Sequence, residues 1–321
     1  MPRISVVIPT HARPEQLRRS VESARNAGSD IEIIVVDDAS TDETAAVCRT
    51  LYDIKYLRLE RNQGVAGARN LGIMHSQGEY ISFLDDDDLR LPGSFDLQAA
   101  LLDAQPNAGF TCGAMLMADQ NYRLTGEVVY PTEANGDVFW KILELDFPIM
   151  GLSTLIRRDS LLSVGLLNRS AIGIDDWDIF VRLSELFPVV TTSEPVGVYR
   201  QPMWNSGQGS SARARQLRHL ARHQIQLMKL PRVVALSPRE RRGIRRRTAG
   251  RIADSLLWGA LQLIPKREYR PVIANVRVAL RLAPWRAFRP AAYRKLAARL
   301  FYPPQKHTVM KVDQLLRLSD L

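Results

Sequence analysis

The chain has little cysteine, no long apolar run and no recognisable secretory signal, and each absence excludes a class of protein. Its two cysteines, Cys48 and Cys112, stand in unrelated contexts without a CxxC pair, which excludes a disulfide scaffold and a cysteine-based zinc site. No window reaches the ~18–20 uninterrupted apolar residues that a membrane-spanning helix needs. The first apolar run ends at Pro9, short of the ~7–15 apolar residues of a secretory signal. We therefore expect a cytoplasmic protein.

Several catalytic and phosphate-binding motifs are also missing. The five histidines form no HExxH or other metal-binding spacing, so we expect them to be structural or solvent-facing. The chain has no GxSxG sequence of a serine hydrolase, and it has neither the GxGxxG nor the GxxxxGK[ST] phosphate-binding pattern. The strongest signals that remain are clusters of aspartate.

Composition and charge divide the chain into two parts. With 45% hydrophobic and 24% charged residues, the 321-residue chain has the composition of a globular protein, which excludes general disorder. Residues 1–212 carry 18 Lys and Arg against 29 Asp and Glu, whereas residues 213–321 carry 26 against 5, giving net charges of −11 and +21. We expect an acidic catalytic domain over 1–212 and a basic α-helical region over 213–321, with helices at 216–230, 238–263, 269–282 and 291–300.

Strands and helices alternate along the first part of the chain. Short β-branched runs predict buried strands at 4–8, 31–36, 56–59 and 80–84, and helical spacing predicts helices at 13–27, 43–51 and 67–76. This order is typical of an α/β protein with a mostly parallel, doubly wound sheet. Ligands bind such sheets at the carboxyl ends of the strands, where the polar turns of this chain fall.

The four adjacent aspartates at 85–88 follow a buried strand and form the strongest motif. Their mutual repulsion is relieved by a cation, and Mg²⁺ or Mn²⁺ is commonly held by one or two carboxylates together with substrate phosphates. The alternative is a solvated acidic turn. The pair Asp37 and Asp38 also ends a strand. There the carboxylates either stabilise the N-terminus of the next helix or accept hydrogen bonds from the base and ribose of a nucleotide.

Two further segments carry candidate residues. Residues 62–70 (NQGVAGARN) combine a glycine-rich turn with the start of a helix, from which Arg69 can reach an anionic ligand. Residues 175–178 (DDWD) open another helix, where one aspartate suffices for capping, so one of the three is a candidate general base.

These motifs together resemble a known family. In chain order they are 6–10 (VVIPT), 35–42 (VVDDASTD), 62–64 (NQG) with 68–70 (ARN), and 78–81 (GEYI) running into 83–88 (FLDDDD). They resemble family two of the inverting glycosyltransferases, which have the GT-A fold. The likeness is dense from residue 4 to about residue 95 and resumes at 175–178, which resembles the family's Glu-Asp motif with aspartate in place of the glutamate.

The resemblance implies a nucleotide-sugar donor, above all a UDP-sugar, and a hydroxyl of a glycan or lipid-linked saccharide as acceptor. It implies a donor site made of Pro9, Thr10, Asp38, Arg69, Asp85 and Asp86. Within that site Asp38 would accept a hydrogen bond from the nucleobase, and Asp85 would approach the ribose. Asp87 would bind the metal, Mn²⁺ or Mg²⁺, and Asp176 would be the general base of a single inverting displacement. His11 stands where many relatives have tyrosine.

Two other functions stay open at this stage. A +21 region is suited to nucleic acid, and residues 236–242 (LSPRERR) resemble the opening of a helix-turn-helix, although no turn and recognition helix follow. A nucleotidyltransferase would also use a metal and acidic residues, but the 175–178 motif and the missing basic phosphate loop disfavour it. We expect no nucleic-acid partner.

The basic region also predicts a membrane contact. Its arginines are interleaved with apolar and aromatic residues: Leu256, Leu257, Trp258, Leu261, Trp285, Phe288, Tyr293 and Phe301. Such a mixture is typical of a helix at the surface of an anionic bilayer, here the inner face of the cytoplasmic membrane. The alternative is that these residues pack on the oppositely charged catalytic domain.

Overall fold

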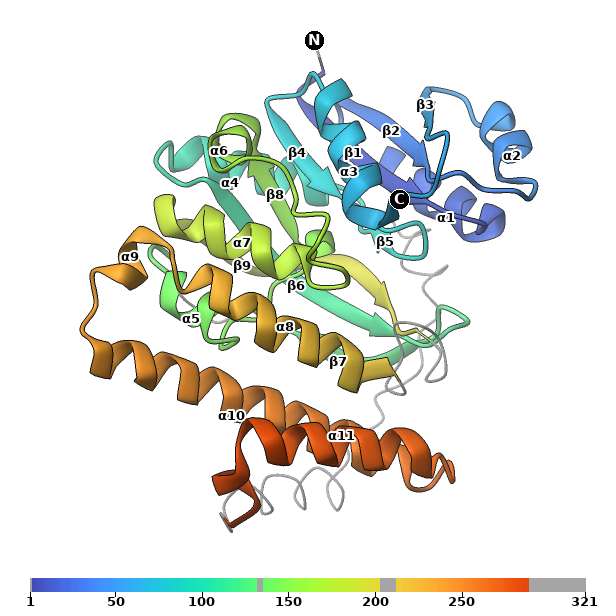
Figure 1. The fold of residues 1–321 in the computed structure, drawn as a ribbon. Coiled ribbons are helices and arrows are strands. Elements are labelled where there is room, and N and C mark those ends of the chain that lie inside the picture. The colour runs from blue at the N-terminus through green and yellow to red at the C-terminus, as the bar shows by residue number, and fades with distance from the viewer. Residues whose placement is uncertain (1, 132–134, 203–211, 289–321) are drawn as a thin grey trace.

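The computed structural model describes residues 2–131, 135–202 and 212–288, and its centre is one mixed β-sheet (Figure 1). The strand order across the sheet is β3-β2-β1-β4-β8-β6-β9-β5, with β7 paired to β6. The strands are β1 (Ile4–Thr10), β2 (Ile31–Asp37), β3 (Ile54–Arg58), β4 (Tyr80–Phe83), β5 (Leu89–Arg90), β6 (Phe110–Ala118), β7 (Leu124–Val129), β8 (Thr154–Arg157) and β9 (Val189–Arg200).

The first half of the sheet is parallel, as the sequence predicts. Strand β1 lies between β2 and β4, with Val7 opposite Ile34 on one side and Phe83 on the other. All of β1 is buried, which explains its nearly continuous apolar sequence. The second half is mixed, because β8 pairs antiparallel with both β4 and β6 while β6 and β9 run parallel. The predicted parallel order is therefore found from β1 to β4 and again between β6 and β9.

Helices cover both faces of this sheet. They are α1 (Pro14–Arg25), α2 (Thr44–Thr50), α3 (Gly64–His75), α4 (Ser94–Ala104), α5 (Phe139–Leu143), α6 (Arg158–Val164) and α7 (Asp175–Leu186). Helix α3 approaches β1 closely, because a Cβ on Gly72 would lie 2.3 Å from a methyl carbon of Val7. This approach carries the first turns of α3, and Arg69 with them, to the carboxyl edge of the parallel strands.

The chain beyond residue 212 is helical. It contains α8 (Arg213–Leu227), α9 (Pro231–Val234), α10 (Pro238–Leu263), α11 (Tyr269–Leu282) and the short 3-10 helix η3 (Pro284–Phe288). Ser237 and Glu240 cap α10 reciprocally through each other's backbone N–H groups. Three predicted helices are thereby confirmed, and the fourth, 291–300, lies outside the described residues. Since α10 runs unbroken to Leu263, residues 236–242 do not open a helix-turn-helix.

None of the helices within the described ranges combines the length and the apolar character that crossing a bilayer requires.

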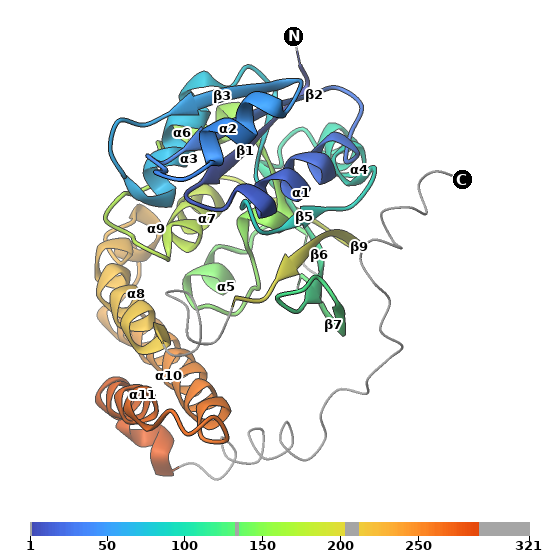
Figure 2. The same ribbon diagram turned by 90° about the vertical axis from the view of Figure 1, so that its right-hand side faces the viewer.

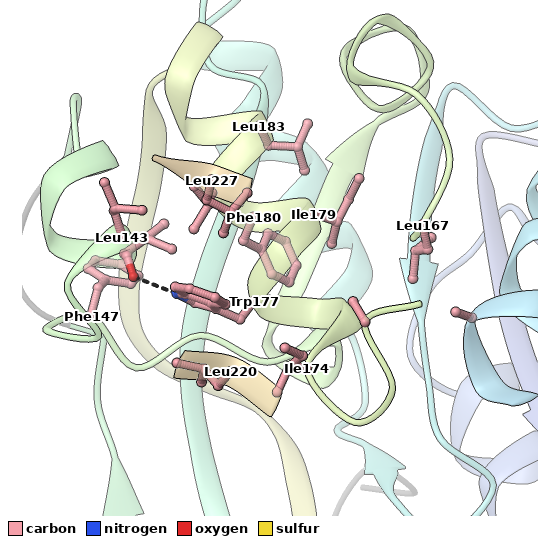
Figure 3. Close-up of a cluster of buried hydrophobic side chains, with 14 of the residues drawn as sticks. Leu143, Phe147, Leu167, Ile174, Trp177, Ile179, Phe180, Leu183, Leu220 and Leu227 are labelled. Carbon is pink, nitrogen blue, oxygen red and sulfur yellow. Dashed lines mark hydrogen bonds between the residues drawn. The ribbon is translucent and has the colours of Figure 1, made fainter. Parts of the chain in front are cut away.

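Helix α8 packs directly on the sheet domain. Figure 3 shows Leu220 and Leu227 of α8 around Trp177 of α7, and all three side chains are buried in one apolar cluster. Trp177 donates its indole N–H to the carbonyl of Ile142 at 2.8 Å. Helix α10 adds a bidentate ion pair between Arg247 and the carboxylate of Glu144. For α8 and the inner face of α10, the basic region therefore packs on the sheet domain, which was the alternative to a membrane contact.

Candidate active site

A pocket opens at the carboxyl ends of β1 and β4. Its lining residues are Pro9, Thr10, His11, Arg13, Asp38, Val65, Ala68, Asp85, Asp86 and Asp87. Six of the residues assigned to the donor and metal by the sequence thus line one pocket, although they come from three separate turns. The seventh, Arg69, lies beside it and forms ion pairs with Asp85 and with Asp176, the predicted base.

The acidic run is mostly buried, so it is not a solvated turn. Asp86, Asp87 and Asp88 are only 5%, 8% and 2% exposed. Asp86 accepts a hydrogen bond from the Thr10 hydroxyl at 2.8 Å and forms an ion pair with Arg13 at 3.1 Å. Burial raises the pKa of Asp86 to about 6 against the opposing charge of Arg13. Burial likewise raises the pKa values of Asp87 and Asp88, so a further positive charge here would stabilise the ionised forms.

Arg69 connects the acidic run to the DDWD motif. Its guanidinium donates to Asp85 at 2.6 Å and to Asp175 at 2.9 Å, and it also pairs with Asp176. Burial would lower the pKa of Arg69, but the charges of these three carboxylates outweigh burial and raise it. The side chain is 4% exposed and does not line the pocket. Its predicted contact with the leaving diphosphate stays a prediction, and its observed role is to hold the carboxylates in place.

The three aspartates of the DDWD motif have different environments. Asp176 accepts a hydrogen bond from the backbone N–H of Gly151 at 3.0 Å, and its side chain remains 29% exposed. Asp175 is buried against Arg69, and burial raises its pKa to about 6. Asp178 pairs instead with His223 at 2.6 Å and with Arg182. Asp176 therefore keeps the accessibility that a general base requires, whereas Asp178 joins α7 to α8.

The Asp37 and Asp38 pair divides into a structural residue and a residue of the pocket. Asp37 is fully buried and accepts from the backbone N–H of Ser40, the Tyr56 hydroxyl and Arg58. Asp38 lines the pocket and accepts from the N–H groups of Gln63 and Gly64 at 2.6 and 2.8 Å. Those bonds hold the glycine-rich turn against the end of β2.

Three residues of the site were not assigned from the sequence. Arg13 bridges Asp86 and Asp87, and Arg200 at the end of β9 reaches Asp87 at 3.4 Å. His11 lines the pocket and donates through Nδ1 to the carbonyl of Asp38 at 2.8 Å. The position of Arg13 in the turn after β1 was a usable signal. No sequence signal pointed to Arg200, because its position beside the pocket depends on how β9 pairs in the mixed half of the sheet.

The carboxylates of the pocket suit a divalent cation whose remaining coordination positions are filled by a bound ligand. Within the described ranges, no group of three or more histidine, cysteine or carboxylate side chains encloses a metal by itself. The carboxylates that line the pocket are those of Asp38 at the end of β2 and of Asp85, Asp86 and Asp87 after β4. Mg²⁺ and Mn²⁺ prefer oxygen and commonly take part of their coordination from substrate phosphates. This acidic edge matches that chemistry.

The fold and this edge define the GT-A class, a mixed α/β fold whose parallel half presents acidic turns at its carboxyl ends. Within that class, the N-terminal part of the chain is similar to glycosyltransferase family 2. The model of "Glycosyl transferase family 2" matches residues 5–150.

Curated relatives agree over part of their length. An uncharacterized glycosyltransferase of Haemophilus influenzae is 26% identical over 184 residues, covering 56% of this chain and 61% of the relative. The GalNAc(5)-diNAcBac-PP-undecaprenol beta-1,3-glucosyltransferase of Campylobacter jejuni is 41% identical over 100 residues, covering 29% of this chain and 32% of that enzyme. The chain thus spans less than two thirds of each of these relatives.

Solved structures share the fold at low identity. The mannosyltransferase PcManGT of Pyrobaculum calidifontis, solved with GDP-Man and Mn²⁺, has a TM-score of 0.57 and 17% identity, with 95% of this chain and 88% of that one covered. TarS 1-349 of S. aureus, solved with UDP-GlcNAc, has a TM-score of 0.54 and 16% identity, with 91% and 92% covered. Both likenesses concern the fold.

Proposed function

We propose that this protein is an inverting glycosyltransferase that moves a sugar from a nucleotide-diphosphate donor, a UDP-sugar, to a hydroxyl of a glycan or lipid-linked acceptor. The observation that carries the proposal is the position of Arg69. Its buried guanidinium pairs with Asp85 of the acidic run and with Asp176 of the DDWD motif, which lies 107 residues further along the chain. The donor element and the candidate base therefore share one anchor.

The donor would lie along the carboxyl edge of β1, β2 and β4. Pro9 and Thr10 would line the pocket of the nucleobase. Asp38 accepts two hydrogen bonds from backbone N–H groups and would use its remaining lone pairs to accept a hydrogen bond from the nucleobase. Asp85 would accept from the ribose hydroxyls. Asp87, next to Asp86, would hold a divalent metal, which when bound would neutralise charge on the leaving diphosphate.

Asp176 would act on the acceptor. Its carboxylate takes the proton of the attacking hydroxyl as the acceptor oxygen bonds to the anomeric carbon and the bond from that carbon to the diphosphate oxygen breaks. One displacement from the opposite face inverts the anomeric configuration. The ion pair with Arg69 holds the Asp176 carboxylate in position.

Two findings on other proteins support the choice of donor and acceptor class. The Campylobacter jejuni relative is named for a glucosyl transfer to an undecaprenol-linked saccharide. The TarS neighbour was solved with UDP and with UDP-GlcNAc. A UDP-sugar and a lipid-linked saccharide are accordingly the first donor and acceptor to examine.

Replacement of one carboxylate tests the donor site. Asp87→Asn removes a charged oxygen ligand at nearly constant shape, so calorimetry should show that Mn²⁺ no longer strengthens UDP binding, whereas wild-type protein binds UDP more tightly with Mn²⁺ than without. Asp30→Asn, at an exposed carboxylate outside the pocket, is the matched control and should behave as wild type. Unchanged metal-dependent affinity in Asp87→Asn would remove Asp87 from the metal site.

A further inference from the structure

The outer face of α11 is apolar and exposed. Tyr269 and Ile273 are each 59% exposed and Leu280 is 44% exposed, although all three lie on an ordered helix. The opposite side of the helix carries the buried residues Asn275, Val278 and Ala279, which face α10 and α8. Packing within the protein therefore uses one side of α11 and leaves the other side uncovered by any described residue.

Arginines share this outer face. Arg270, Arg277 and Arg281 are exposed, and at about 100° per residue they fall with Tyr269, Ile273 and Leu280 within one sector of about 120°. Helix α11 contains no acidic residue. Among the described residues none of these three arginines pairs with a carboxylate, in contrast to Arg247 and Arg286 on the packed side of the module.

The structure also corrects which residues of the basic region are exposed. Leu256 is fully buried, and Leu257 and Trp285 are half-buried against the core, with Trp285 stacked under Arg246. Trp258 and Leu261 are half-buried as well. Nothing is described of the Phe288 side chain, and Tyr293 and Phe301 lie outside the described residues. The expected exposed mixture of apolar and basic side chains is therefore found on α11. Its residues are different from those that the sequence analysis named.

We propose that the outer face of α11 binds the surface of an anionic lipid bilayer. Apolar side chains would enter the boundary between headgroups and acyl chains while the flanking arginines pair with lipid phosphates. Figures 1 and 2 show α10 and α11 at the end of the molecule farthest from β1 to β3. The exposed residues Arg239, Arg242 and Arg245 of α10 extend the positive charge beyond α11.

Charge and polarity favour a bilayer over other occupants. Residues 289–321 carry 7 Lys and Arg against 2 Asp and Glu, so this segment would be repelled by the face rather than attracted to it. The same face of a second copy has the same sign. Nucleic acid would pair with the arginines but would leave Ile273 and Leu280 against phosphate and water, whereas an anionic bilayer satisfies both kinds of side chain.

Vesicle flotation of the full chain tests the proposal. The protein should float with vesicles of equal parts phosphatidylcholine and phosphatidylglycerol, float weakly with phosphatidylcholine alone, and be released from the anionic vesicles by high salt. Replacing the three arginines with glutamine should weaken partitioning about five-fold for each, roughly a hundred-fold together. The pair Ile273→Ser and Leu280→Ser should weaken it about ten-fold or more at unchanged charge.

Matched controls separate this surface from general effects of charge or polarity. The first control makes the same number of glutamine substitutions at exposed arginines of the sheet domain: Arg18→Gln, Arg49→Gln and Arg123→Gln. The second makes two serine substitutions at exposed leucines of α6 and α7: Leu162→Ser and Leu186→Ser. Both controls should float as wild type does.

Three results would overturn the proposal. They are equal flotation with neutral and anionic vesicles, no loss of flotation in either α11 variant when circular dichroism shows an intact fold, and an equal loss in the matched controls. Self-association through α11, seen as a concentration-dependent mass in sedimentation with no lipid binding, would also contradict it. UDP binding is measured on the same samples, so failure of the membrane proposal and failure of the proposed transfer activity are distinguished.

Discussion

Exposure distinguishes the carboxylates of the site. Asp176 keeps 29% of its side chain accessible, whereas its neighbour Asp175 keeps 9%. Both carboxylates pair with Arg69, but a base must meet the acceptor hydroxyl, which the nearly inaccessible carboxylate of Asp175 cannot do. The assignment of the base to Asp176 therefore depends on geometry that the DDWD sequence alone leaves open.

Asp176→Asn should lower turnover by ~10²–10⁴ and leave the affinity for UDP within about a few-fold, because general base catalysis contributes to the transition state and not to donor binding. Steady-state kinetics and calorimetry on the same preparation check this. Collapse of UDP binding together with turnover would place Asp176 in the donor site or in the fold.

Asp175 should impose a distinctive pH dependence on stability. Burial raises its pKa from 3.8 to about 6, so between about pH 4 and pH 6 the folded chain retains a proton that the unfolded chain has released. The stability contributed by this group is full below pH 4 and is lost as the pH rises through 6. Urea unfolding across this range should show wild type losing stability relative to Asp175→Asn. A constant or widening advantage of wild type would contradict the raised pKa.

The sequence predicted pocket residues from their place after strands, and this succeeded where position alone decides. Asp38 and the run from Asp85 to Asp87 reach the pocket because the carboxyl ends of parallel strands share one edge. Arg13 and Arg200 were not assigned, because a long guanidinium side chain reaches over a distance that sequence position does not reveal. The role of Asp37 stayed open, since only the fold shows that Tyr56 and Arg58 enclose it.

At the scale of elements, the apolar contact between α7 and α8 includes one buried polar pair. His223 lies 2.6 Å from Asp178, both are buried, and the His223 ring also packs edge-on against Trp177. Burial alone would raise the pKa of Asp178, but the bond from His223 and the charge of Arg182 lower it. The ionised carboxylate thus fixes α8 on the sheet domain.

His223→Ala should lower the free energy of unfolding by about 1–3 kcal/mol, because it leaves a buried carboxylate oxygen without its partner. His219→Ala, one turn earlier on the same helix at an exposed histidine, is the matched control and should change stability by less than about 0.5 kcal/mol. Urea denaturation measures both. Equal effects of the two substitutions would mean that the pair with Asp178 contributes nothing to stability.

Elements were predictable where a local rule applies. The helix at 238–263 matches its predicted bounds, because Ser237 and Glu240 cap its start and Pro238 stands at its first position. Strands β1 and β4 were predicted because burial on both faces makes them nearly continuous apolar runs. Strand β5 has only two residues, and β9 pairs in parallel with β6 and antiparallel with β5, so neither leaves a periodic signal in the sequence.

At the scale of the whole molecule, the two oppositely charged parts of the chain share one core. The apolar cluster that contains Val7 and Phe83 of the sheet also contains Leu220 of α8 and Leu256 of α10. The boundary at residue 212 therefore marks a change of composition and charge, and the separation of 1–212 and 213–321 into two domains stays a prediction. Opposite charge accompanies this contact, as in the pairing of Glu144 with Arg247.

The central claim is a single displacement at an anomeric carbon on this edge of the sheet. Its most direct test takes the nucleotide sugar that binds best from a panel with Mn²⁺, adds the protein, and follows the donor by proton NMR while water acts as acceptor. With wild type, and not with Asp176→Asn, we expect release of the nucleoside diphosphate and a free sugar that first appears with the anomeric configuration opposite to that of the donor. A first-formed sugar of retained configuration, or release of pyrophosphate from a nucleoside triphosphate in place of this reaction, would contradict it.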